Sequence, residues 1–437
     1  MSSTTLSKFT SSVTSSTSTA LTVGALLLAG SADHSAAEVN QKILEFTRAA
    51  AVSQGIHQAS NSTAQFDPQL AEFGRKFFET KALSNSNDIA CLDCHLPEFG
   101  SSDGLPVSVG VGGSGTGPDR ALGRGEMIPR NSLPLWGRGE PDFRTFFWDG
   151  RVQDTGDTLV SQFGTALPSF DPLVVAVHLP VVEIREMMIE NEIITPVKTE
   201  ATSTAGIAYQ SIVDNLIDKE PEVMELFAEY LRQSDLHNIS FLDIAQSVAA
   251  FIRQDFAIPE TRFSAFVNGE DTLSYMEVEG AYLFFGKGKC VVCHSGPYLS
   301  NFQFYAIGFP QLGFGRNGFG IDYGRYNATH NPSDLYKFRV PPLWNVGNTG
   351  PYGHSGSVAT LTDAITHHYD PLRYFDADAI DSHERIEYYK VILSATEVMA
   401  TVPQLTDSET EKIAAFLRTL SFSGIQQADR LAQLPEQ

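Results

Sequence analysis

Two short segments, CLDCH at residues 91–95 and CVVCH at residues 290–294, constrain this chain more than any other feature. Together they contain all four cysteines of the 437 residues. A bare Cys-x-x-Cys pair would fit a disulfide or a redox motif, and four cysteines could bind one zinc ion. Neither interpretation explains the histidine that directly follows each pair.

Covalent haem attachment explains that histidine. Both thiols bond to the vinyl groups of the haem, and the adjacent histidine reaches the iron as its proximal ligand. The sequence therefore predicts two c-type haems, one held by Cys91, Cys94 and His95 and the other by Cys290, Cys293 and His294.

The charge balance excludes one class of partner. The chain has 52 acidic and 30 basic residues and a net charge of −22. Because nucleic-acid binding needs a positive surface, we expect no nucleic-acid partner. Aromatic residues make up 11% of the chain and charged residues only 19%, which indicates a folded globular protein rather than a disordered one.

The N-terminus has the pattern of an export signal. Lys8 precedes a Ser/Thr-rich stretch and then the apolar run ALTVGALLLAG at residues 20–30. This run is too short to cross a bilayer but suits the core of a signal peptide. We expect residues 1–37 to be a signal peptide and the protein to be periplasmic or otherwise exported, with a disordered leader or a retained anchor as the alternatives. No later segment is apolar enough to span a membrane, so none is expected to do so after cleavage.

Amphipathic patterns near each Cys-x-x-Cys-His motif predict helices. Residues 66–78 have leucine and phenylalanine at helical spacing just ahead of the first motif, and residues 239–254 open with a near capping box. Residues 276–290 lead into the second motif as a helix that ends at glycine, and residues 405–420 begin with another capping box.

The predicted fold class is mainly α, with two cytochrome c-like haem domains and long Gly/Pro-rich loops. The loops include residues 100–118 and 307–324, and strand patterning is scarce. We place the N-terminal haem domain at residues 38–255 and the C-terminal one at residues 256–437.

Seven segments, in order along the chain, resemble the bacterial dihaem cytochrome c peroxidase superfamily, which includes the MauG-like enzymes. The resemblance covers roughly residues 68–425. The segments are FGRKFF, CLDCHLPEFGSSDGLPVSVGVGG, PRNS, FFWDGR, GAYLFFGKGKCVVCHSGP, DYGR and PYGHSGSVATLTDAI.

The resemblance implies different roles for the two haems. Classical members of the family cap the N-terminal iron with a histidine until reduction releases it, but the corresponding position here is Val111. Valine cannot ligate iron, so the N-terminal haem is expected to be open to peroxide or capped only by water. This departure favours the MauG-like branch.

The distal ligand of the second haem falls in ITHHYD. The family register selects His368, with His367 and Tyr369 directly beside it. A bis-histidine haem suits electron storage and transfer. A one-residue slip would instead make Tyr369 the ligand, because it rotates a helical side chain by roughly 100°.

The resemblance also implies a relay and a metal site. Trp148 in FFWDGR matches the tryptophan between the two haems, although a packed core tryptophan is the alternative. A calcium ion would be bound near Asn131, Thr349 and Pro351, whose neutral oxygens suit a hard cation.

A proton-transfer group is expected over the open iron. The family uses a glutamate in a Glu-Met pair, and here LPVVEIREMM at residues 179–188 offers Glu183 and Glu186. Glu186 precedes Met187 and fits the pair, although its distance along the chain from Trp148 is longer than in classical peroxidases. A solvated helix face is the alternative for both glutamates.

The sequence thus predicts an exported dihaem oxidoreductase that reacts with hydrogen peroxide at the His95 haem. Electrons would arrive through the His294 haem, from a small redox protein or from the side chains of a protein substrate. The alternative is a dihaem electron carrier without enzymatic activity, for which an open iron would serve no purpose.

Overall fold

A computed structural model describes residues 36–56, 62–164, 166–189, 202–318, 320–373, 376, 378 and 380–422. The predicted signal peptide, residues 1–37, lies outside the described residues except for its last two. The chain divides into two units, Met1–Gln41 and Lys42–Gln437. Of the first unit only the beginning of helix α1 is described, and everything below concerns the second.

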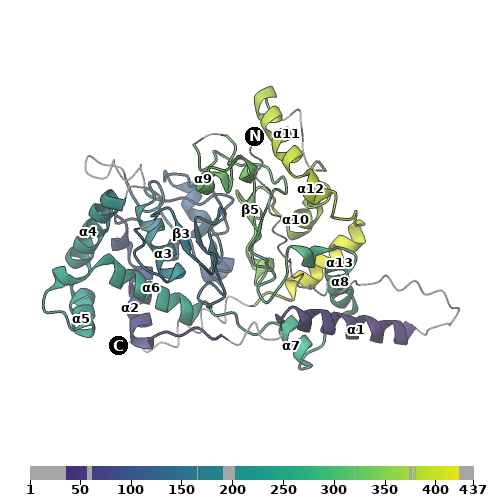
Figure 1. Cartoon of the computed structure of the whole chain (residues 1–437), viewed down its shortest axis with the longest axis horizontal. Helices are drawn as coiled ribbons and strands as arrows, with labels where there is room; N and C mark the ends of the chain where they lie inside the picture. The colour runs from purple at the N-terminus through teal and green to yellow at the C-terminus, as the bar shows by residue number, and fades with distance from the viewer. Residues whose placement is uncertain are drawn as a thin grey trace, which may run out of the picture. The chain divides into compact units, whose positions relative to one another are not determined.

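The chain is mainly α-helical, as predicted, and Figure 1 shows its helices joined by long irregular segments. The α-helices are α1 (Ala36–Ser53), α2 (Pro68–Glu79), α3 (Pro172–His178), α4 (Thr202–Lys219), α5 (Pro221–Leu231), α6 (Phe241–Asp255), α7 (Arg262–Asn268), α8 (Tyr275–Phe285), α9 (Tyr326–Thr329), α10 (Leu361–His367), α11 (Ser382–Ser394), α12 (Thr396–Met399) and α13 (Asp407–Arg418).

The four helices predicted near the haem motifs are confirmed as α2, α6, α8 and α13. Their ends follow from capping chemistry, because side-chain oxygens accept hydrogen bonds from backbone N–H groups that have no partner within the helix. Ser240 and Asp243 form a capping box at α6, and Thr406 and Glu409 form one at α13. Helix α8 ends at Gly286, as the sequence indicated.

Two helix pairs repeat one packing arrangement. Helix α2 packs on α6 and helix α8 packs on α13, and Figure 1 shows each pair side by side. At each crossing a glycine permits the close approach. A Cβ atom on Gly74 would lie 1.9 Å from the carbonyl oxygen of Ser247, and one on Gly280 would lie 1.8 Å from that of Lys412. Only glycine fits either position.

A small antiparallel sheet was not predicted. Strands β1 (Thr145–Phe146), β2 (Val152–Asp154) and β3 (Leu159–Ser161) pair in that order, with Phe146 opposite Val152 and Val152 opposite Ser161. Strands β2 and β3 of this sheet lie between Trp148 and Glu186 in the sequence. A second sheet pairs β4 (Phe304–Tyr305) with β5 (Phe338–Arg339).

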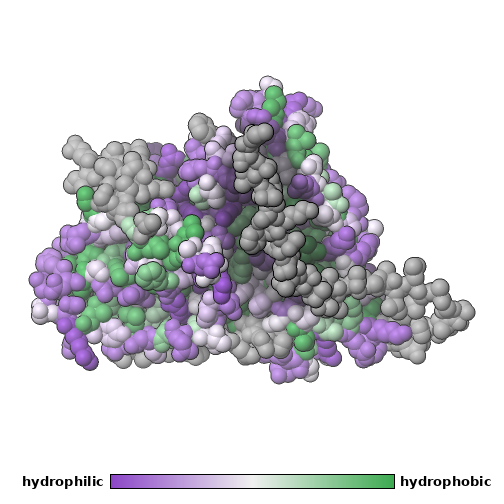
Figure 2. All heavy atoms as spheres, in the orientation of Figure 1, coloured by the Kyte–Doolittle hydropathy of each residue, from purple (hydrophilic) through white to green (hydrophobic). Residues whose placement is uncertain are grey.

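The surface mixes hydrophilic and hydrophobic residues, as Figure 2 shows for one face, including helix α11. The exposed apolar side chains of α11 are Ile386, Tyr389 and Leu393. Among the described residues, no helix has the length and apolar character needed to cross a membrane.

Candidate active site

The first Cys-x-x-Cys-His motif forms one tight turn. Cys91–Asp93 is a 3-10 helix, and the backbone N–H of His95 donates to the carbonyl oxygen of Cys91 at 3.0 Å. The Nδ1–H of His95 donates to the carbonyl oxygen of Ser101 at 2.9 Å. This hydrogen bond leaves the lone pair on Nε2 free, which is the arrangement that a metal-ligating histidine needs.

The second motif repeats this geometry. Cys290–Val292 is again a 3-10 helix, and the backbone N–H of His294 donates to the carbonyl oxygen of Cys290 at 2.8 Å. Its Nδ1–H donates to the carbonyl oxygen of Leu299 at 2.9 Å. All four cysteines of the chain are described and carry free thiols, so neither pair forms a disulfide.

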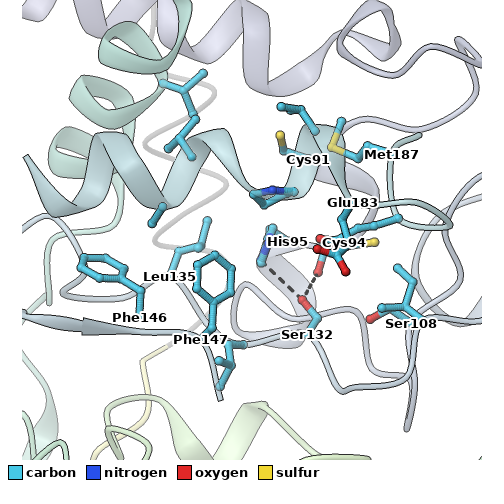
Figure 3. A pocket seen from close by; sticks show the side chains of 18 of the residues that line it. Cys91, Cys94, His95, Ser108, Ser132, Leu135, Phe146, Phe147, Glu183 and Met187 are labelled. Atoms are coloured by element: carbon cyan, nitrogen blue, oxygen red, sulfur yellow. Dashed lines mark hydrogen bonds between the residues drawn. The ribbon is translucent and has the colours of Figure 1, made fainter. Parts of the chain in front are cut away.

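A cavity of about 200 Å³ opens beside the first motif. Figure 3 shows Cys91, Cys94 and His95 facing it, with Glu183 and Met187 also at its wall. The cavity also has an apolar lining and a few charged side chains. The apolar side chains include Phe78, Leu83, Leu135, Phe146, Val181 and Phe241, and the charged ones are Arg130, Arg138, Arg151, Glu183, Glu186 and Arg316.

Val111 lies outside the cavity lining. Its side chain is buried at 3% exposure in the core. Its backbone N–H donates to the carbonyl oxygen of Arg185 at 3.0 Å, and its carbonyl oxygen accepts from the backbone N–H of Glu126. This position therefore presents neither a ligating atom nor a side chain to the cavity.

Glu183 is fixed by two arginines from distant parts of the chain. Its carboxylate accepts from Arg151 Nη1 at 3.0 Å and from Arg316 Nη2 at 3.4 Å. Burial acts to raise the pKa of Glu183, but the charges of Arg316 and Arg151 outweigh it, and the pKa is lowered. Glu183 is therefore ionised at neutral pH.

Glu186 lies at the same cavity in a different electrostatic setting. Burial and then the charge of Glu183 raise the pKa of Glu186 to about 7. Two neighbouring carboxyl groups with separated pKa values form the arrangement from which acid and base roles arise. Because Glu186 titrates near neutrality, it can both accept and donate a proton there.

Trp148 lies at the cavity beside a buried ionic network. Its indole N–H donates to the carbonyl oxygen of Asn131 at 3.0 Å, and its ring centroid lies 6.5 Å from that of Phe338. The guanidinium of Arg130 bridges Asp149 at 2.7 Å and Asp322 at 2.8 Å. This network ties the FFWDGR segment to the DYGR segment.

His368 faces His294. Their ring centroids are 6.4 Å apart at an interplanar angle of 63°. The Nδ1–H of His368 donates to the carbonyl oxygen of Ala364 at 2.8 Å, so its Nε2 also keeps a free lone pair.

The two neighbours of His368 lie elsewhere. The ring of His367 stacks on Phe309 at a centroid distance of 4.4 Å. The hydroxyl of Tyr369 hydrogen-bonds with the hydroxyl of Thr410 at 2.8 Å. Both side chains are buried in contacts of their own.

Two of the three predicted calcium positions donate hydrogen bonds to backbone carbonyl groups. The side-chain amide of Asn131 donates to the carbonyl oxygen of Leu105 at 2.7 Å, and the hydroxyl of Thr349 donates to that of Val346 at 3.3 Å. The Gly350–Pro351 peptide bond is cis. The described residues contain no cluster of three or more His, Cys, Asp or Glu side chains suited to a metal ion.

The arginines of the cavity were not singled out from the sequence. Arg151 belongs to FFWDGR, so that motif was a signal for it. Arg316 comes from a glycine-rich loop with no recognisable pattern. Its role follows only from the fold, which brings it to Glu183 across 133 positions of the chain.

The residues present fit a haem. Each motif offers two free thiols and a histidine with an available Nε2, and the cavity at the first motif has the apolar walls that a macrocycle needs. These features define a class of helical protein with two motifs suited to haem attachment and a cavity that ionisable side chains line.

The comparisons with known proteins agree with that class. The family model for di-haem cytochrome c peroxidase matches residues 68–272. The chain is 27% identical over 301 residues to cytochrome c551 peroxidase of Pseudomonas aeruginosa, covering 68% of this chain and 70% of the relative. It is 25% identical over 327 residues to the methylamine utilization protein MauG of Paracoccus denitrificans, covering 68% and 74%.

A solved structure shares the fold. The diheme peroxidase BthA from Burkholderia thailandensis matches with a TM-score of 0.59 and 20% sequence identity, covering 83% of this chain and 88% of that one. The family model and these relatives support a place for the chain in the dihaem cytochrome c peroxidase and MauG superfamily. The chain is a dihaem peroxidase-type oxidoreductase, and this sets aside the alternative of an electron carrier without enzymatic activity.

Proposed function

We propose that this protein reduces hydrogen peroxide in the cavity at His95 and receives electrons through a second haem at His294. The observation that carries the proposal is the cavity itself, which combines a histidine with a free Nε2 and a glutamate that titrates near neutrality. The position of the family's capping histidine is Val111, which lies outside the cavity lining and offers no ligand.

Cys91, Cys94 and His95 would hold the first haem covalently, and Cys290, Cys293 and His294 the second. When bound, the haem at His95 supplies an iron that binds peroxide and accepts its oxidising equivalents. We assign the first haem to the half of the chain at residues 38–255 and the second to the half at residues 256–437.

Glu186 moves the proton in this mechanism. Its ionised carboxylate takes a proton from the first oxygen of hydrogen peroxide and returns it to the departing second oxygen, so that water can leave. Glu183 stays ionised between Arg151 and Arg316, and its negative charge keeps the pKa of Glu186 high. The apolar walls limit the entry of water that would compete for the proton.

His368 is proposed as the distal ligand opposite His294. The ring centroids of His294 and His368 are 6.4 Å apart, so both imidazoles would be available to hold the same haem. The hydroxyl of Tyr369 is engaged by Thr410. The ring of His367 stacks on Phe309, whereas the ring of His368 meets Phe309 edge-on and faces His294. This haem would store and pass on electrons without binding substrate.

Trp148 is proposed as the relay between the two haems. Its indole is large, oxidisable and rigidly held by the hydrogen bond to Asn131. The carbonyl oxygen that accepts this bond cannot take up the indole proton, so Trp148 would pass charge without losing that proton. A calcium ion near Asn131, Thr349 and Pro351 would stabilise the same region.

The electron donor is proposed to be a small redox protein or the side chains of a protein substrate. The net charge of −22 favours a basic partner. The N-terminal apolar run supports export, so we propose that the protein works in the periplasm or another exported location.

The ferric protein tests this proposal directly. Its absorption and electron paramagnetic resonance spectra should contain one high-spin and one low-spin haem, and cyanide should bind the high-spin one without prior reduction. Two low-spin haems, or a requirement for half-reduction before peroxide turnover, would show that another residue caps the first iron.

A further inference from the structure

Two buried arginines have no carboxylate partner among the described residues. The exposed fractions of Arg138 and Arg339 are 7% and 1%. Within the described ranges, no carboxylate oxygen lies within 4.0 Å of either guanidinium. Arg130 is equally buried, yet it contacts both Asp149 and Asp322. A buried charge without a counter-charge is unfavourable, so this pair needs an explanation.

The hydrogen bonds of both arginines go to neutral carbonyl groups. Arg138 donates from Nε to the carbonyl oxygen of Pro134 at 2.7 Å. Arg339 donates from Nε to that of Phe147 at 2.9 Å and from Nη1 to its own neighbour Val340 at 3.4 Å. The Nη2 atom of Arg339 is buried and has no partner among the described residues. Several N–H groups therefore remain available to an anion.

The two guanidinium groups lie near the same aromatic ring. Arg138 lies 5.9 Å and Arg339 lies 5.7 Å from the ring centroid of Phe143. Burial lowers the pKa of Arg138 to about 10, and burial together with the charge of Arg138 lowers the pKa of Arg339. Two like charges are thus buried, and the charge of Asp149 offsets the lowered pKa of Arg339 only in part. A bound carboxylate would balance them further.

Their positions connect both haem motifs. Arg138 lines the cavity at His95. The backbone N–H of Arg339 donates to the carbonyl oxygen of Trp148 at 2.8 Å. Arg339 also stands two positions before Pro341, whose backbone acts to raise the pKa of His294. The pair therefore lies where the surroundings of the two motifs meet.

We propose that Arg138 and Arg339 bind the propionate carboxylates of the bound haems, Arg138 at the His95 site and Arg339 at the His294 site. A guanidinium offers two parallel N–H donors that match a carboxylate, and its charge balances the propionate in a buried setting. This inference rests on haem binding as proposed above. It adds the two residues whose positive charges would balance the propionates. Neither Cys-x-x-Cys-His motif contains a positively charged residue for this role.

The test uses the two-haem protein and the variants Arg138→Gln and Arg339→Gln. Haem content is measured first by the pyridine haemochrome method, because a chain without haem would refute the proposed function rather than this inference. In the Arg138→Gln variant, the propionate bending band of the His95 haem should shift in the resonance Raman spectrum. Because a positive charge is removed, the reduction potential of that haem should also fall by about 59 mV. This corresponds to a shift on the order of tenfold toward the ferric form for one electron.

Arg253→Gln is the matched control, because Arg253 is a partly buried arginine that already pairs with Asp171 at 2.6 Å. This control should leave the propionate bands and the reduction potentials of both haems unchanged. If Arg138→Gln does not accumulate, Arg138→Lys replaces it, because lysine keeps the positive charge but loses the paired N–H donors. The reduction potential of the His95 haem should then stay unchanged, whereas its propionate bending band should still shift. A two-haem Arg138 variant, glutamine or lysine, whose propionate bands match those of the unaltered protein would overturn the inference.

Discussion

Replacement of Glu186 by glutamine tests the proposed proton transfer. The amide has the same shape as the carboxyl group but cannot accept a proton at neutral pH. A positioned acid–base group contributes roughly 10²- to 10⁴-fold to a rate. We therefore expect the second-order rate constant for peroxide consumption to fall by that factor, which corresponds to a loss of about 3 to 5 kcal/mol of transition-state stabilisation.

The pKa of Glu186, about 7, fixes the expected pH dependence. The carboxylate would be ionised in roughly 9% of molecules at pH 6, half at pH 7 and roughly 91% at pH 8. Because the ionised form accepts the proton, the rate constant should rise about tenfold from pH 6 to pH 8 and then level off. The glutamine variant should lack this rise.

Glu183→Gln provides the matched comparison in the same assay, which is stopped-flow mixing of the oxidised protein with peroxide. This change removes the negative charge beside Glu186 and frees the positive charges of Arg151 and Arg316. Both effects favour ionisation of Glu186, so the pH profile should move to lower pH without disappearing. If Glu183→Gln abolishes the pH-dependent rise and Glu186→Gln keeps it, the two roles are reversed and our reasoning fails.

Three further changes test other parts of the molecule. His368→Ala should convert the second haem to high spin in the ferric absorption spectrum, whereas Tyr369→Phe should not. The opposite result would make Tyr369 the ligand. Trp148→Phe should preserve both haem spectra but slow electron exchange between the haems in flash-reduction experiments, because a phenyl ring is harder to oxidise than an indole. Equal exchange rates would reduce Trp148 to a packing residue. Arg130→Gln strands two buried carboxylates and should lower the free energy of unfolding by about 3 to 5 kcal/mol in chemical denaturation. A loss within the error of that measurement would mean that solvent or another cation replaces the guanidinium.

The parts of the fold that local chemistry determines could be predicted. Helices α6 and α13 begin at capping boxes, and α8 stops at a glycine, so each boundary depends on residues within a few positions of it. The sheet of β1, β2 and β3 was missed because its strands have two or three residues each. Strands that short show no alternation in the sequence, and their pairing is decided by tertiary contacts.

The candidate site also contains some features that the local sequence indicates and others that depend on tertiary contacts. Each Cys-x-x-Cys-His motif is a single turn, so five consecutive letters are enough to indicate it. The partners of Glu183 and the isolation of Arg138 and Arg339 depend on which distant segments meet. Charge pairing between such segments leaves no periodic trace in the sequence. These residues could be recognised only once the fold was known.

The contact between Arg316 and Glu183 has a consequence for how this protein can evolve. The match to the family model ends at residue 272, before Arg316, whereas Glu183 lies within it. A recombination event that joined the first half of this protein to the second half of a relative would keep both haem motifs and Arg151 but could lose Arg316, one of the two cations that hold Glu183. Inheritance should therefore keep the two halves together, since the charge balance of the first cavity is encoded partly in the second half.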